Sequence, residues 1–324
     1  SGRSSSVIHS GIYNPQDFLK SSHCIKGRPM LYEFCRLRGV PCRKTGKLIV
    51  ATTPDEQNAL GRLFNHGISK GVDGLVMLDE AQLHKMEPLV RGAAAIFSSE
   101  SGIIDVTSLL KALKEDARSV GAQFAFRTEV LSLLCGETTA DILLQGESRP
   151  LRAKIVINAA GLDAYRMAIE TVGKQVWPEP WLVKGEYFRL SRSVAISRPI
   201  YPLPKSIGPG IHLTPALDGT VRLGPHMSVI RTLNLQTDSA HKNLFLEAAK
   251  DLLQVKINGE ELEPDVAGVA PCFPGSGGLP GDFLIAERSS CGNAKFIHLL
   301  GIDSPGLTAC LSIAEHVERL VEER

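Results

Sequence analysis

The residues best suited to chemistry lie near the end of the chain, in the stretch LLGIDSPGLT from Leu299 to Thr308. An apolar run precedes it and apolar residues follow at helical spacing, so the stretch joins a strand to a helix. Ser304 suits the N-cap of that helix, and Pro305 its first position. Gly301 and Gly306 would let another group approach the backbone, and the helix amides would face an electron-rich partner. An ordinary capped helix explains the same residues about as well.

A second strand, turn and helix are predicted in the sequence KIVINAAGLDAYRMAIETVG. Its strand, Lys154 to Asn158, is almost wholly apolar, as expected of a strand buried on both faces of a parallel sheet. The small residues up to Gly161 follow the end of this strand, and nucleotides bind beyond the carboxyl ends of strands in open α/β sheets. The same residues also suit a tight crossover that needs small side chains only for packing.

His9 is the single histidine of the N-terminal segment SGRSSSVIHSGIY, in which residues 7–13 are expected to be ordered. A dinucleotide-binding fold should open with a strand, the pattern G-x-G-x-x-G and a helix, and no such opening occurs in the sequence. The nearest match, GSGGLPG from Gly275 to Gly281, leads into the extended stretch DFLIA. It opens no helix and is therefore rejected as a phosphate loop.

Length and composition narrow the class of protein. The 324 residues suffice for one large domain or two ordinary ones. The net charge of +1 offers no electrostatic case for a nucleic-acid partner. The seven cysteines include no C-x-x-C pair, so the sequence predicts reduced thiols, no disulfide framework and no metal site. No apolar run approaches the roughly 18 residues of a membrane span.

The elements that must position these residues alternate between strands and helices. Thr53 is the predicted N-cap of an early helix, with Glu56 completing a capping box, and Asp105 is the predicted N-cap of a later one. The predicted elements are a strand at Lys47 to Ala51, a helix from Pro54 to about Lys70, a helix from about Val106 to Val120, a strand at Gln123 to Thr128, a β-rich stretch from Trp181 to Pro225 with a hairpin at Asp218-Gly219, and a helical segment from Thr232 to Leu253. Two sheets are therefore expected, one parallel and covered by helices, the other mainly antiparallel and inserted between Trp181 and about Ala270.

The chain resembles the flavin-dependent D-amino-acid-oxidase-like superfamily, and within it the L-2-hydroxyglutarate dehydrogenase branch. The resemblance covers nearly the whole chain, in order, on the motifs SGRSSSVIHSGIY, GKLIVA, SGIIDVTSL, VINAAGLDA, VKGEYFRL, IYPLP, IHLTPALDGTVRLGP and LLGIDSPGLTACLSIAEHV. It implies an α/β fold in which a Rossmann-like FAD-binding domain is interleaved with a mainly antiparallel α+β substrate domain. The implied FAD-binding parts are residues 1–46, 101–180 and 271–324, and the substrate-domain parts are residues 47–100 and 181–270.

The resemblance also implies that the sequence is incomplete. Family members carry a first strand-loop-helix unit with the glycine fingerprint before the SGRSSSVIHSGIY segment. About 40 residues of that unit are missing here by the family pattern. The sequence is therefore expected to be a truncated piece, or the product of a gene prediction that lost a first exon.

In this superfamily the final strand-to-helix turn faces the flavin ring, where helix amides stabilise negative charge on the reduced ring. The resemblance places Arg3 and Ser4 near the pyrophosphate or the ring, and Val130 against the adenine through its backbone. The remaining residues implied to bind the cofactor are Ala160 and Gly161 beside the nucleotide, and Gly301, Ile302, Ser304, Pro305, Gly306 and Leu307 at the flavin.

Oxidising a 2-hydroxy acid needs a hydride acceptor, a base for the hydroxyl proton and a cation for the carboxylate. His9 is the predicted base because it falls in the segment that the family places beside the flavin; a packing or surface histidine is the alternative. Tyr187 and Lys184, from the inserted sheet, and His212 are the other predicted catalytic residues. Each of these three suits a solvent-facing strand position equally well.

Two positions depart from the family pattern. Where family members commonly read Gly-Ile-Arg-Pro-Lys, this chain has Ala270 and Cys272 at the two basic positions. If the family arginine holds a substrate carboxylate, its absence removes about 1.5–3 kcal/mol for each charge-assisted hydrogen bond. Either the substrate differs, or activity is lost, or another cation takes over, for which Lys184, Arg189 and Arg222 are the candidates.

The activity implied by the resemblance is FAD-dependent oxidation of a small 2-hydroxy acid, foremost L-2-hydroxyglutarate to 2-oxoglutarate. A quinone or an electron-transfer protein would be the electron acceptor. An amino-acid or glycine oxidase of the same superfamily stays open as an alternative, as does a non-catalytic relic of the fold. The implied location is intracellular, mitochondrial in a eukaryote, and cytoplasmic or peripheral to a membrane in a bacterium.

Overall fold

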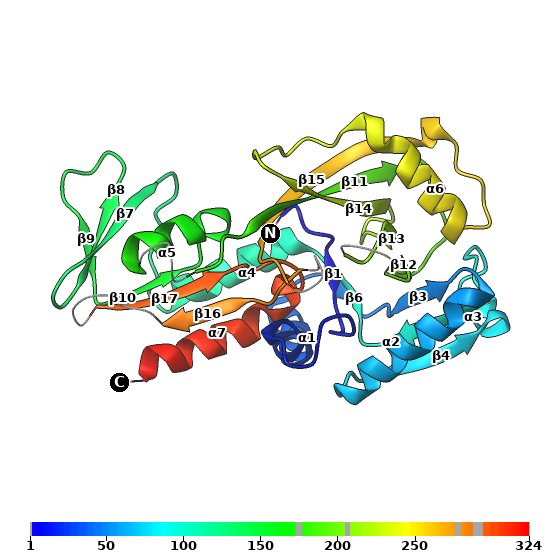
Figure 1. Cartoon of the computed structure of the whole chain (residues 1–324), viewed down its shortest axis with the longest axis horizontal. Coiled ribbons are helices and arrows are strands. Elements are labelled where there is room, and N and C mark those ends of the chain that lie inside the picture. Colours follow the sequence, from blue (N-terminus) through cyan, green and yellow to red (C-terminus); the bar gives the residue numbers. More distant parts are fainter. Residues whose placement is uncertain (1, 173–176, 205–207, 276–279, 288–293, 324) are drawn as a thin grey trace.

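The computed structural model describes residues 2–172, 177–204, 208–275, 280–287 and 294–323. A large twisted sheet with α6 packed against it forms one end of the molecule, and smaller sheets with α1, α5 and α7 form the other (Figure 1). Most of the GSGGLPG stretch, and Cys291, lie outside the described residues. The other six cysteines carry free thiols.

The large sheet has eight strands in the order β15-β11-β14-β13-β12-β3-β5-β4. Every neighbouring pair is antiparallel except β3 with β12, so the predicted second, mainly antiparallel sheet is confirmed. The hairpin at Asp218-Gly219 is also confirmed, because it joins β13 to β14. The strands are β3 (Lys47–Ala51), β4 (Leu75–Asp79), β5 (Ala94–Ser98), β11 (Trp181–Leu190), β12 (Ile200–Pro202), β13 (His212–Pro215), β14 (Val221–Ile230) and β15 (Leu262–Cys272).

Both faces of this sheet are covered, because residues on successive positions of a strand point to opposite faces. On β3, Leu48 and Val50 pack into one core with Phe245 of α6, whereas Ile49 and Ala51 pack into another with Leu60 of α2. The helices involved are α2 (Gln57–Ser69), α3 (Glu80–Met86) and α6 (Lys242–Leu252). The start of β3 therefore lies between two hydrophobic cores, which buries any side chain placed there.

The parallel sheet is small. Its order is β10-β17-β16, with β10 parallel to β17 and β16 antiparallel to it. The nearby helices are α1, α5 and α7, with α1 packed along α7. The elements are β10 (Ile155–Asn158), β16 (Leu284–Glu287), β17 (Lys295–Leu300), α1 (Leu19–Arg38), α4 (Val106–Ser119), α5 (Ala164–Val172) and α7 (Gly306–Glu322).

The prediction that the strand before Asn158 is buried on both faces is wrong. β10 is an edge strand among the described residues, and Ile155 and Ile157 remain 38% and 48% exposed. An apolar groove of about 500 Å³ lies beside it, between Ile157 and α7. Apolar composition alone did not distinguish a doubly covered strand from an edge strand next to an open apolar surface.

Two short sheets complete the architecture. One has the order β1-β6-β2 and carries the N-terminal segment, and the other, β7-β8-β9, is a meander at the end of the molecule away from the large sheet (Figure 1). Their strands are β1 (Val7–Ile8), β2 (Cys42–Arg43), β6 (Gly102–Ile104), β7 (Val130–Cys135), β8 (Ala140–Leu144) and β9 (Leu151–Ala153). The α/β class with interleaved sheets is confirmed.

Three local predictions are wrong. Residues 123–128 form no strand; Phe124 and Phe126 stay exposed and pack against Arg118 and Lys114 of α4. The segment after β14 becomes helical only at the 3₁₀ turn η4 (Ser239–His241), because residues 231–238 extend along the edge of a pocket. The Thr53 side chain makes no capping hydrogen bond, so the predicted capping box does not form; Glu56 accepts hydrogen bonds from the amide and hydroxyl of Thr52 instead.

The other elements agree with the sequence. The predicted helices after Thr53 and after Asp105 both form, and Asp105 accepts from the amides of Thr107 and Ser108. None of the helices formed by the described residues is both long enough and apolar enough to cross a membrane.

The two N-caps give a test of this local structure. We expect Asp105→Ala to lower the free energy of unfolding by about 1 kcal/mol, because it removes the cap of α4. Thr53→Ala should change it by less than about 0.5 kcal/mol, because the Thr53 hydroxyl caps nothing. Urea denaturation followed by circular dichroism measures both, and equal losses in the two variants would contradict the assigned capping.

Candidate active site

A cluster of aromatic and basic side chains lies where the N-terminal segment crosses β3, β12 and β13. The register pairs Tyr201 with Ile49 and brings His212 onto the adjacent strand. The rings of Tyr201 and His212 stack with centroids 3.8 Å apart, and Tyr13 stacks on the other side at 6.4 Å. Residues from four separated segments thus form one compact site.

Lys47 lies at the centre of this cluster. Its side chain is fully buried, and its Nζ is 4.6 Å from the ring centroid of Tyr13 and 4.5 Å from that of Tyr201. Within the described chain, Nζ has no hydrogen-bond partner and pairs with no carboxylate. Burial lowers the pKa of Lys47 to about 7, because removal from water disfavours the charged ammonium. The aromatic faces offset part of this cost.

Other buried polar atoms near Lys47 also have no partner among the described residues. They are the hydroxyls of Tyr13 and Tyr201, and the Ser10 hydroxyl in the N-terminal segment lacks a partner as well. An unpaired buried polar group is costly, and such groups commonly mark a site where a bound molecule or water completes the hydrogen bonding. The cluster therefore has the composition of a binding site for a polar, anionic molecule.

His9 joins this cluster to the start of α7. Its backbone N–H donates to Oγ1 of Thr308, in the first turn of the helix, at 3.0 Å. Burial, and to a smaller extent the nearby charge of Lys47, lower the pKa of His9 to about 3. The imidazole is therefore neutral at physiological pH, and it becomes an effective base only when the charge of Lys47 is offset.

The segment that carries His9 and Tyr13 is held by hydrogen bonds to its backbone carbonyls. Lys70 Nζ donates to the carbonyls of Gly11 and Ile12 at 2.8 and 2.9 Å, and also to that of Asn14. Arg28 donates to the carbonyl of Ser10 at 3.3 Å. These contacts fix the backbone near the cluster while leaving the side chains of the site free of charged partners.

Three of the four predicted catalytic residues lie around Lys47. His212 is buried and shares a hydrogen bond of 2.9 Å with Thr214; its pKa is lowered by burial and then by His9 and Lys47. Tyr187 is buried close to Tyr201, and burial raises its pKa. The structure thus brings together His9, His212 and Tyr187.

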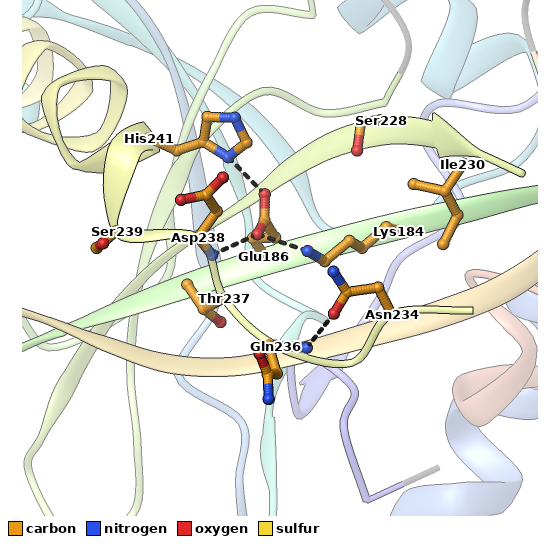
Figure 2. A pocket seen from close by; sticks show the side chains of 10 residues that line it. All are labelled: Lys184, Glu186, Ser228, Ile230, Asn234, Gln236, Thr237, Asp238, Ser239 and His241. Carbon is orange, nitrogen blue, oxygen red and sulfur yellow. Dashed lines mark hydrogen bonds and ion pairs between the residues drawn. The ribbon is translucent and has the colours of Figure 1, made fainter. Parts of the chain in front are cut away.

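Lys184 does not join them. Side chains alternate along β11, so Lys184 and Glu186 share the face away from Tyr187. They form a buried ion pair of 2.8 Å that lines a separate polar pocket (Figure 2). The other two predicted substitute cations are also paired, Arg189 with Glu263 and Arg222 with Asp265.

The turn before α7 differs in detail from its predicted form. The N-cap is Pro305 and the helix begins at Gly306, so the assignment of Ser304 as N-cap is wrong by one residue. Gly301 has a positive φ of 65°, and a Cβ there would meet the ring of Phe273 at 2.6 Å, so only glycine fits. Buried Asp303 pairs with Lys20 at 2.6 Å and anchors the turn to α1. Ile302 and Leu307 are half-buried beside it.

The N-terminus of α7 retains free hydrogen-bond donors. The amides of Leu307 and Thr308 have no backbone acceptor in the part of the chain that the structure describes. Gly306 and Ile302 border the apolar groove beside this helix end. Free amides at the positive end of a helix, next to an apolar surface, suit a flat molecule with an electron-rich edge.

The remaining predicted cofactor residues are scattered. Arg3 donates to the carbonyls of Ala267 and Leu235 at 2.9 and 3.3 Å, so its guanidinium is directed to β15 and the adjoining segment. Ser4 accepts from the amide of Ser6. The Val130 carbonyl accepts from Arg166. Ala160 and Gly161 are exposed at the end of β10, with Gly161 at a φ of 62°.

Comparison with known proteins identifies the family of this chain. Residues 1–320 match the family model described as FAD dependent oxidoreductase, DAO. The chain belongs to this family. It is 31% identical over 360 residues to the protein named L-2-hydroxyglutarate dehydrogenase, mitochondrial, from Arabidopsis thaliana, covering 98% of this chain and 74% of the relative.

Solved structures of the same fold include two oxidases. The dithionite-reduced L-alpha-glycerophosphate oxidase from Mycoplasma pneumoniae with FAD bound superposes with a TM-score of 0.89 at 24% identity, over 100% of this chain and 85% of that one. Glycine oxidase from Geobacillus kaustophilus has a TM-score of 0.77 at 21% identity, over 98% and 84%. The cofactor of this family is FAD, and the free amides of α7 fit its electron-rich ring.

The sequence analysis did not single out Lys47, Tyr13 or Tyr201, and Lys47 is the one among them that carries a charge. The available signal was a lysine at the start of the otherwise apolar strand KLIVA, whose five residues are all buried. A charged residue in a fully buried strand is rare unless it is paired or functional.

Ala270 and Cys272, the two positions that depart from the family pattern, lie on β15, and Cys272 is buried next to Asp303.

Lys47 should make stability depend on pH. Because the pKa of Lys47 falls from 10.5 to about 7 on folding, the unfolded chain binds more protons in that interval and stability rises with pH there. Lys47→Met removes the cost of burying an ammonium group. The variant should therefore be more stable than wild type by about 2–4 kcal/mol near pH 7, and this gain should shrink toward pH 10. Melting temperatures across this range measure the effect. The exposed control Lys111→Met should show no such trend, and a pH-independent difference for Lys47→Met would contradict the assignment.

Proposed function

We propose that this protein is an FAD-dependent 2-hydroxy-acid dehydrogenase that oxidises L-2-hydroxyglutarate to 2-oxoglutarate. Family membership supports the redox chemistry, and the name of the Arabidopsis relative supports the substrate class. The observation that carries the proposal is the buried, unpartnered ammonium of Lys47 beside the neutral imidazole of His9.

Lys47 would bind the substrate carboxylate. A 2-hydroxy acid carries a carboxylate next to the carbon that is oxidised, and a buried ammonium without a partner is the complementary group. Lys184, Arg189 and Arg222 are each neutralised by a carboxylate, which leaves Lys47 better suited than these three candidates. Lys47 would thereby take the role of the arginine that family members commonly carry where this chain has Ala270.

His9 would accept the hydroxyl proton on its imidazole. When bound, FAD supplies the hydride acceptor for C2 of the substrate. Loss of the hydroxyl proton makes hydride departure easier, so a neutral base within reach speeds the reaction. A carboxylate on Lys47 would offset the positive charge that lowers the pKa of His9, and would thereby make His9 a stronger base.

Neighbouring groups would orient these two residues. The Thr308 hydroxyl holds the His9 backbone at the start of α7, and the rings of Tyr13 and Tyr201 restrict Lys47 to one direction. His212 and the hydroxyls of Tyr13 and Tyr201 would contribute hydrogen bonds to the substrate oxygens. Electrons would then leave to a quinone or an electron-transfer protein, which forms part of this proposal.

The substrate contact can be tested in the flavin-loaded protein. We expect Lys47→Met to raise KM for L-2-hydroxyglutarate by about 10–100-fold, the cost of one charge-assisted contact. Arg189→Met, which removes an exposed cation paired with Glu263, should leave KM unchanged. Steady-state assays with a quinone analogue measure both. An unchanged KM in Lys47→Met would refute the carboxylate contact, and turnover of glycine or D-amino acids alone would refute the substrate class.

The base is tested separately. His9→Ala should retain FAD and slow flavin reduction by about 10²–10⁴-fold, the usual contribution of a general base. Single-turnover absorbance changes measure this step, and His84→Ala, at a half-buried position next to Gln254 and outside the candidate site, is the matched control. Near-normal reduction in His9→Ala together with a large loss in His212→Ala would transfer the assignment to His212.

A further inference from the structure

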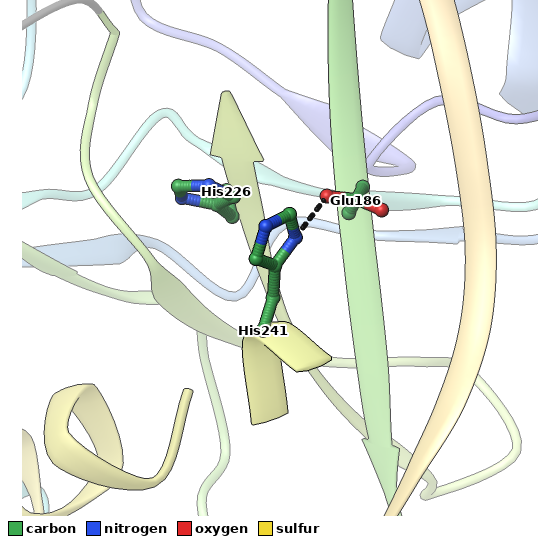
Figure 3. Close-up of side chains that lie close together, drawn as sticks. All are labelled: Glu186, His226 and His241. Carbon is green, nitrogen blue, oxygen red and sulfur yellow. Dashed lines mark hydrogen bonds and ion pairs between the residues drawn. The ribbon is translucent and has the colours of Figure 1, made fainter. Parts of the chain in front are cut away.

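Three metal-ligating side chains converge on the outer part of the large sheet, away from Lys47. Glu186 on β11 pairs directly with His226 on β14 in the strand register. η4 folds over these strands and brings His241 to the same point (Figure 3). One ligand atom from each side chain lies within 4.8 Å of the others.

The carboxylate of Glu186 is oriented as in a metal site. Its Oε1 accepts from Lys184 Nζ at 2.8 Å and from the amide of Asp238 at 2.7 Å. Its Oε2 faces His241 Nδ1 at 2.7 Å (Figure 2). One oxygen is thus held by hydrogen bonds, as is common for carboxylates that ligate metals, while the other hydrogen-bonds with an imidazole that is itself a possible ligand.

The two histidines complete the donor set. Their rings meet edge to face with centroids 4.8 Å apart. No hydrogen bond to the His226 ring is found within the ranges that the structure describes, whereas a buried or half-buried imidazole normally has a partner. Two imidazoles and one carboxylate form the ligand set of three-residue zinc sites, and they disfavour Ca²⁺ and Mg²⁺, which prefer oxygen ligands.

The cluster is accessible from solvent. His241 and Glu186 line a polar pocket of about 460 Å³ together with Asn234, Gln236 and Thr237 (Figure 2). The His241 side chain is 35% exposed. A metal ion could enter through this pocket, and water could take the coordination positions that the protein leaves free.

We propose that Glu186, His226 and His241 bind a divalent transition metal, with Zn²⁺ as the best match to the donor set. The ion would replace the hydrogen bond between His241 and Glu186, and the ligand atoms, now within 4.8 Å of one another, would adjust to about 3.4 Å, the separation that tetrahedral zinc distances of about 2.0–2.2 Å require. Because His241 belongs to η4, the bound ion would tie the segment of residues 231–241 to β11 and β14. The proposal does not depend on the proposed activity.

The test uses the whole chain and Zn²⁺ alone. Isothermal titration should give one tight site per chain, and added Zn²⁺ should raise the melting temperature. His241→Ala and His226→Ala should each weaken this site by about 100-fold or more. His84→Ala, at the surface near Gln254, should bind like the wild type.

Two further measurements keep the proposal falsifiable if a variant folds poorly. Circular dichroism reports folding of His241→Ala, whose partly exposed side chain should tolerate the change. X-ray absorption of the wild-type zinc complex should show only nitrogen and oxygen ligands, with the scattering pattern of two imidazoles. Sulfur ligands, unchanged affinity in the folded His241→Ala and His226→Ala variants, or no binding by the wild type would each overturn the proposal.

Discussion

The candidate active site is organised around the desolvated ammonium of Lys47, and its other contacts depend on this burial. Placing a cation between two hydrophobic cores is unfavourable unless something compensates, and the compensation here is the two tyrosine faces 4.5 and 4.6 Å away. Tyr13 reaches this position because Lys70 holds the carbonyls of its segment. Tyr201 reaches it because β12 lies parallel to β3. The site therefore depends on the large sheet and on the N-terminal segment together.

The same segment connects this site to the helix end that suits a flavin. The His9 amide donates to Thr308, so a shift of α7 would also move His9. Close packing limits such a shift, because a Cβ on Gly27 of α1 would lie 2.7 Å from the Thr308 carbonyl oxygen. The buried pair of Lys20 with Asp303 adds a second link between α1 and the turn. His9, proposed as the base, Lys47, proposed as the carboxylate-binding cation, and the helix end are thereby held as one unit, as preorganised catalysis requires.

β11 separates two kinds of chemistry by the alternation of its side chains. Tyr187 faces the aromatic cluster around Lys47, while Lys184 and Glu186 face the polar pocket and the two histidines. Glu186 neutralises Lys184, which removes that lysine from consideration as a substrate cation. The same strand also contributes Phe188 and Leu190 to the main hydrophobic core, so the buried polar groups of β11 all precede Phe188.

The sequence by itself determined the class of fold and the strand-to-helix turn at Gly301 to Gly306, because these depend on local spacing, capping and the ordered set of motifs. It also indicated most helices, since amphipathic spacing is a local property. Only the tertiary structure decided which cation is free, because pairing of Lys184, Arg189 and Arg222 with carboxylates depends on strand register. The exposure of β10 and the meeting of Glu186 with His226 and His241 are likewise long-range outcomes. Glu186 and His226, 40 positions apart in the sequence, became neighbours through strand pairing, which no local spacing rule encodes.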